Sequence, residues 1–194
     1  MTSGEPTPPT DWFMVLRGPF YDFDDDSEED PELTGVSAAL VTRLRAMIPT
    51  WLSLGLTDGA TLACYEDGRL RVGVEIDDPD ANILLGYLRI DVSDHEWLAA
   101  WVSSARRIAD ADMADADPCE TVGGPIDNEQ ARVDEAVGWL ETQLHRTILR
   151  QVWRDGGRVV AESWRLEGSG RELAVAGSEL LRRSRQPDAA LPIR

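Results

Sequence analysis

The sequence contains no lysine, so its 19 arginines are the only side chains that are always cationic at neutral pH. Against 36 aspartates and glutamates they leave a formal net charge of −17. Nucleic acids and anionic membranes are bound through cationic side chains, so this charge argues against direct binding to either. No stretch approaches the roughly 20 consecutive apolar residues that span a membrane. Residues 1–10 also lack the basic and apolar regions of a signal peptide.

Cysteine and histidine are almost as scarce, with Cys64, Cys119, His95 and His145 as the only examples. Two cysteines predict no disulfide framework, and the default for such a chain is the reduced cytoplasm. Two histidines exclude a histidine-rich metal site, and the acidic run from Asp22 does not fit the spacing of an EF-hand loop. Phosphate-binding glycine loops and a nucleophile elbow are also missing. We therefore predict no catalytic residue, no metal ligand and no cofactor.

The charge is unevenly distributed along the chain. Residues 1–130 hold 8 arginines and 27 acids, whereas residues 131–194 hold 11 arginines and 9 acids. A negative field on one part of a protein speeds its encounter with a basic partner. The acids are densest at 22–32, and further groups lie at 75–80 and 110–120. Like charges at this density cannot share a core, so we expect all three groups on exposed loops or at the frayed ends of elements.

These acids give the candidate partner-binding residues, with solubility alone as the competing explanation. Two tryptophans of the C-terminal part complete the set, because an exposed indole supplies a large contact area. They could instead pack against neighbouring strands within a sheet. The candidates are Asp22, Asp24, Asp25, Asp26, Glu28, Glu29, Asp30, Asp77, Asp78, Asp80, Trp153 and Trp164.

The N-terminal part shows one helical pattern followed by alternating ones. Apolar residues from Leu33 to Trp51 recur at helical spacing, with a kink or restart expected at Pro49. Strands are predicted at 60–66, 69–77 and 83–92, the first two joined by the hairpin signal Asp67-Gly68. Their alternation predicts a three-stranded antiparallel sheet with one solvated face, which includes Tyr87, Arg89 and Asp91.

Two capping patterns then predict two further helices. Ser93 with Glu96 forms a capping box, and the helix after it would bury Leu98 and Trp101. Residues 122–125 are a linker candidate, and a second cap at 127–130 starts a helix that runs towards His145. Residues 147–153 fit either state, and we favour a strand because the tight turn at 155–157 needs one upstream. Strands at 158–166 and 171–176 and a short basic helix at 178–185 follow.

The predicted fold class is α+β, with two helix–three-strand antiparallel units and the helices packed on one face. An architectural duplication would be one explanation of the two units. The predicted organisation is a disordered N-terminal arm (1–10), a first unit (11–122), a second unit (126–186) and a tail (187–194).

The charge and the fold class favour a non-catalytic acidic module that binds a basic protein surface. Immunity proteins, antitoxins and chaperones are the physical types, and the helix–three strands–helix order resembles that of acidic specialised-secretion chaperones in architecture alone. One alternative is an enzyme with a dispersed carboxylate site using Mg²⁺. A further alternative is a nucleic-acid mimic, in which carboxylates imitate phosphates. The oligomeric state and the partner's identity are left open.

Overall fold

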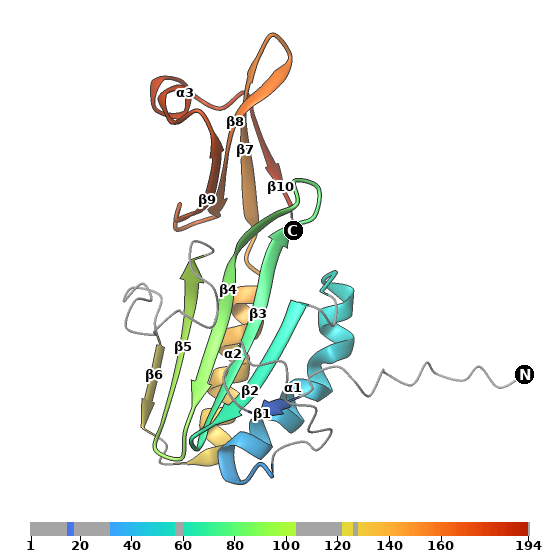
Figure 1. Ribbon diagram of the computed structural model, residues 1–194, viewed down its shortest axis with the longest axis vertical. Coiled ribbons are helices and arrows are strands. Elements are labelled where there is room, and N and C mark those ends of the chain that lie inside the picture. Colours follow the sequence, from blue (N-terminus) through green and yellow to red (C-terminus); the bar gives the residue numbers. More distant parts are fainter. Residues whose placement is uncertain (1–14, 18–31, 57–59, 104–121, 126–127, 194) are drawn as a thin grey trace, which may run out of the picture.

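The computed structural model describes residues 15–17, 32–56, 60–103, 122–125 and 128–193. These residues form two β-sheets, arranged one above the other along the long axis of the molecule, together with three helices (Figure 1). The predicted mixture of helices and antiparallel sheets is confirmed. The expected arm at 1–10 and the acidic groups at 22–30 and 110–120 lie outside the described residues. No helix in the described ranges is long and apolar enough to cross a membrane.

The first sheet, sheet A, has six strands that follow one another in sequence order. Its first pair is parallel and all its other pairs are antiparallel. The predicted hairpin turn is present, because Asp67 and Gly68 both have positive φ (49° and 74°), as a two-residue type I′ turn requires. The strands are β1 (Val15–Arg17), β2 (Thr61–Glu66), β3 (Arg69–Asp78), β4 (Ile83–Val92), β5 (Glu96–Ser103) and β6 (Val122–Pro125).

Helices α1 (Gly35–Ser53) and α2 (Glu129–Leu144) contribute to the core that lies against sheet A. Helix α1 continues through Pro49 without ending there. Helix α2 begins at the predicted cap, where the Asn128 side chain accepts a hydrogen bond from the amide of Ala131. Large apolar side chains of both helices and of the central strands are buried together; they include Leu40, Leu44, Leu140, Leu144, Leu70, Leu88 and Ile90.

The helix predicted after Ser93 is wrong, because this segment is strand β5. The amide of Glu96 does donate to the Ser93 hydroxyl (3.3 Å), as in a capping box. The Ser93 amide also donates to the Glu96 carbonyl (2.9 Å), which closes a tight β-turn instead of opening a helix. Trp97, Ala99 and Trp101 then alternate into the core beside β4, so the period is two. The linker expected at 122–125 is the edge strand β6.

The expectation of a solvated face on sheet A is also wrong. Tyr87, Arg89 and Asp91 are only 7%, 5% and 4% exposed, although they point away from the helices. Arg89 and Asp91 satisfy each other through two hydrogen bonds, from Nε to Oδ1 (2.7 Å) and from Nη2 to Oδ2 (2.8 Å). A bidentate pair of this kind lets two charges lie in a buried layer. Tyr87 belongs to a second apolar cluster with Cys64 and Val102.

The second sheet, sheet B, has the strand order β10-β7-β8-β9. The strand favoured for 147–153 is confirmed as β7, and the turn after it has positive φ at both Gly156 and Gly157. The expected tail contains a strand that pairs with β7, so the sheet has a fourth member. The elements are β7 (Ile148–Asp155), β8 (Arg158–Leu166), β9 (Glu172–Gly177), α3 (Glu179–Ser184) and β10 (Ala189–Pro192).

The two sheets share one continuous apolar core. Ile148, Trp164 and Leu166 of sheet B are fully buried in the same cluster as the side chains of sheet A. The sheets contain six and four strands, not three each. A duplication of a helix–three-strand unit therefore stays a prediction.

Candidate interaction surfaces

Three aspartates lie at the turn between β3 and β4, and only one of their carboxylates is buried. Asp78 is 1% exposed, whereas its neighbours Asp77 and Asp80 are exposed. Oδ1 of Asp78 accepts the amides of Asp80 (3.1 Å) and Ala81 (3.2 Å), which holds the turn. The expectation that this whole acidic group lies on the surface is therefore wrong for Asp78.

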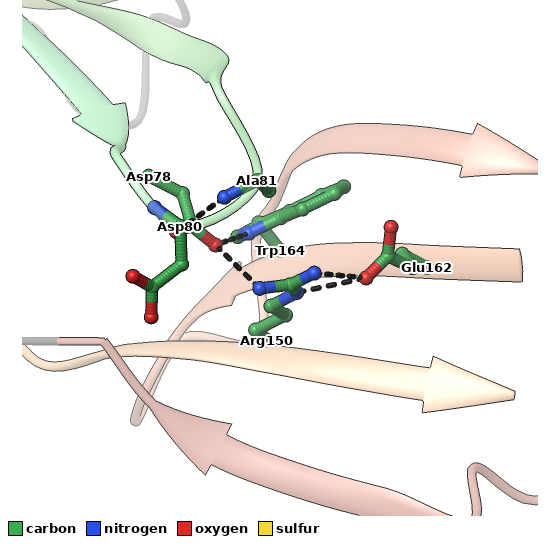
Figure 2. A network of polar contacts seen from close by, with 6 residues as sticks. All are labelled: Asp78, Asp80, Ala81, Arg150, Glu162 and Trp164. Atoms are coloured by element: carbon green, nitrogen blue, oxygen red, sulfur yellow. Dashed lines mark hydrogen bonds and ion pairs between the residues drawn. The ribbon is translucent and has the colours of Figure 1, made fainter. Parts of the chain in front are cut away.

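The other carboxylate oxygen of Asp78 reaches sheet B (Figure 2). It accepts the indole N–H of Trp164 at 2.7 Å and lies 3.5 Å from a guanidinium nitrogen of Arg150. Arg150 also donates twice to Glu162 and lies over the Trp164 ring, with its central carbon 5.7 Å from the centroid. Asp78 therefore accepts three hydrogen bonds and forms an ion pair with Arg150, and this network connects the two sheets.

Both candidate tryptophans are buried in the described structure. Trp164 is 0% exposed and belongs to the core, and Trp153 is 3% exposed, with its indole N–H donating to the carbonyl of Arg185 (3.0 Å). Strand pairing sets Trp153 opposite Ala161 and Trp164 opposite Arg150, so the two indoles lie on opposite faces of sheet B. Their observed contacts are internal packing and hydrogen bonding.

Two titratable groups on the face of sheet A away from the helices have shifted pKa values. Burial raises the pKa of the Glu75 carboxyl, and the negative charge of Asp77 adds to the rise. Burial likewise raises the pKa of the Cys64 thiol to about 12, with Arg71 acting in the opposite direction. Cys64 is therefore a protonated, buried thiol at neutral pH.

A groove rich in arginine lies between α3 and sheet B. It has a volume of about 410 Å³, and four of its nine lining residues are arginines: Arg165, Arg182, Arg183 and Arg185. Gln151, Trp153 and Ser184 also line it, and no acidic side chain does. The basic character of the final helix was visible in the sequence. The contribution of Arg165 from β8 depends on the pairing of sheet B and could not be predicted.

The uneven distribution of charge along the chain follows its division into two sheets. Residues 146–194, which include all of sheet B, hold 10 arginines and 6 acids. Residues 1–145, which include sheet A and both long helices, hold 9 arginines and 30 acids. The boundary between negative and positive sequence thus coincides with the boundary between the sheets, and the arginine groove lies on the positive side.

Comparison with protein-family models, with curated proteins and with solved structures finds no match to this chain. Within the described ranges, no group of three His, Cys, Asp or Glu side chains is placed to hold a metal ion.

Proposed function

We propose that this protein is a non-catalytic interaction module, which binds a basic surface of another protein through its acidic part. The observation that carries the proposal is the separation of charge along the chain, with 30 acids and 9 arginines in residues 1–145. Asp77 and Asp80 face solvent at the β3–β4 turn. The proposed docking residues are these two together with the dense acidic run at 22–30, which lies outside the described residues.

The exposed state of Asp77 and Asp80 supports a docking role. Exposed carboxylates keep their hydration until a partner arrives, so opposite charge speeds association without destabilising the free protein. Single exposed ion pairs contribute little, and a cluster is therefore needed for a useful effect. Asp78 lies between them in the sequence but has its hydrogen-bonding capacity used by Trp164, Arg150 and the turn amides.

The proposal places the module in the cytoplasm, without direct contact to nucleic acid or membrane, as an immunity-like, antitoxin-like or chaperone-like protein. The two alternative functions, a Mg²⁺-dependent enzyme and a nucleic-acid mimic, require other arrangements of the carboxylates. A Mg²⁺-dependent enzyme needs carboxylates that converge on a cation, whereas Asp78 turns towards Trp164 and Arg150. A nucleic-acid mimic needs rows of outward carboxylates on folded elements.

The test compares variants of the full chain in affinity purification from the source lysate. The acidic-surface variant carries Asp24→Asn, Asp25→Asn, Asp26→Asn, Asp77→Asn and Asp80→Asn. The matched control is Glu167→Gln, which removes one exposed charge from the turn after β8. A basic partner that is retained by the wild type and the control, and lost by the acidic-surface variant, supports the proposal. Equal retention by all three proteins contradicts it.

A further inference from the structure

We propose that the groove between α3 and sheet B is a second binding site, which takes a short acidic peptide segment of another protein. It is separate from the acidic docking surface, carries the opposite charge and stands independently of the proposed function. Its floor comes from β7 and β8 through Gln151, Trp153 and Arg165, and its wall from Arg182 and the residues after it.

The arginines of the groove are only partly compensated by acids of the chain. Arg165 and Arg182 share a single oxygen of Glu172, at 3.2 and 3.3 Å. Arg183 pairs with Glu179 at 2.5 Å, and Arg185 pairs with Asp188 at 3.2 Å. Three carboxylates therefore serve four guanidinium groups, and all three stand outside the groove lining.

Two donors in the groove have no acceptor in the described structure. The Nε atoms of Arg165 and Arg182 are buried, and neither has a hydrogen-bond partner among the described residues. A buried N–H without an acceptor is unfavourable, and a guanidinium donates most strongly to a carboxylate or a phosphate. These guanidinium groups come from two different elements, β8 and α3, and an oxyanion bound in the groove could become the acceptor that their Nε donors lack once the side chains adjust.

The surroundings favour a peptide over a polyanion or a free phosphate. A nucleic acid carries phosphates well beyond the groove, and these would meet the strongly negative sheet A part, whereas a short peptide confines its charges to the groove. Leu180 is 77% exposed and lies one helical turn from Arg183 on α3, which offers an apolar contact beside the cations. Carboxylates next to an apolar side chain match this combination.

The groove also lies away from the junction between the sheets. Residues alternate between the two faces of a strand, so Gln151, Trp153 and Arg165 point away from the face that carries Arg150 and Trp164. Substitutions in the groove can therefore test binding without breaking the Asp78 network.

The experiment measures fluorescence anisotropy of a labelled glutamate-rich peptide with one leucine, against the same peptide with glutamine in place of glutamate. The full chain should bind the glutamate peptide at least about tenfold more tightly. The double variant Arg182→Gln, Arg183→Gln should lose about tenfold in affinity. The control Arg158→Gln removes an exposed arginine of sheet B outside the groove and should bind as the wild type does. If the double variant fails to fold, Arg183→Gln alone replaces it, since that side chain is 78% exposed.

Several results would overturn the assignment. Equal affinity for the two peptides would remove the role of the carboxylates, and equal loss with Arg158→Gln would reduce the effect to overall charge. Displacement of the peptide by an equal concentration of inorganic phosphate would indicate a small-anion site. Tighter binding of a single-stranded oligonucleotide would indicate nucleic acid instead. The variant Asp77→Asn, Asp80→Asn should bind the peptide unchanged, which separates this test from that of the proposed function.

Discussion

The indole N–H of Trp164 donates to Oδ2 of Asp78 across 2.7 Å, between residues that are 86 positions apart in the sequence. Asp78 closes a turn of sheet A and Trp164 lies in the middle of sheet B, so this hydrogen bond joins the two sheets (Figure 2). It also assigns different roles to neighbouring carboxylates. Asp78 is structural, whereas the exposed Asp77 and Asp80 are available for the proposed docking.

Asp78→Asn should destabilise the protein by about 2–4 kcal/mol, because an amide has one acceptor oxygen in place of two and no charge to pair with Arg150, so either the turn amides or Trp164 would face its NH2 group. Asp80→Asn, at an exposed position of the same turn, should change stability by less than about 0.5 kcal/mol. Chemical denaturation measures both values. A double-mutant cycle with Trp164→Phe should give a coupling energy of about 1–3 kcal/mol between the two positions. Independent, additive effects would show that the hydrogen bond does not join the sheets.

Glu75 should make stability depend on pH in a defined direction. Its pKa is raised in the folded state by burial and by Asp77, so folding favours the protonated form. Its contribution to the free energy of unfolding is complete below the pKa of the unfolded chain, near 4.5, and is lost as the pH rises through the pKa of the folded protein. Glu75→Gln should therefore raise the melting temperature at pH 7 and leave it nearly unchanged at pH 4. An equal effect at both pH values would contradict this origin.

Cys64 should be unreactive in the folded protein, because its thiol is buried and its pKa is about 12. The measurement uses the variant Cys119→Ser, so that Cys64 is the only thiol. An aromatic disulfide reagent at pH 8 releases its own aromatic thiolate when it reacts with a protein thiol. The native protein should produce almost none of this thiolate, and the denatured protein should produce one equivalent. Fast release from the native state would show an accessible, ionised thiol.

Gly177 should be the least replaceable glycine of sheet B. Its φ is +76°, and a Cβ there would lie 2.3 Å from the carbonyl oxygen of Val160. Gly170 has a similar φ of +69° with open space around it, so Gly170→Ala should cost about 1 kcal/mol from backbone strain alone. Gly177→Ala should cost about 1–3 kcal/mol more, because it adds overpacking beside the start of α3. Equal melting temperatures for the two variants would contradict this contact.

Local chemistry predicted much of the fold. The turn residues Asp67-Gly68 and Gly156-Gly157 determine two hairpins through positive φ, and the side chain of Asn128 marks the start of α2. The segment after Ser93 fits a helix as well as a strand, because Trp101 belongs both to a helical stripe with Leu98 and to an alternating stripe with Trp97. Pairing with β4 decides between them, and that contact is not local.

The candidate sites depended still more on distant contacts. Arg89 and Asp91 alternate with apolar residues as solvated side chains do, yet each satisfies the other inside the protein. Asp78 continues the inward alternation of β3 after Val74 and Ile76, and the indole of Trp164, 86 positions away, supplies a donor that allows a carboxylate to lie there. The arginine groove needs β8 and α3 side by side, a contact between separate elements that no local pattern predicts.

The most direct test of the account is the salt dependence of partner capture by the full chain from its source lysate. Docking through exposed carboxylates predicts a basic partner that is held at low salt and released above roughly 0.5 M salt, where exposed charges are screened, and that the acidic-surface variant does not capture. A partner held equally at high salt, and equally by that variant, would contradict it.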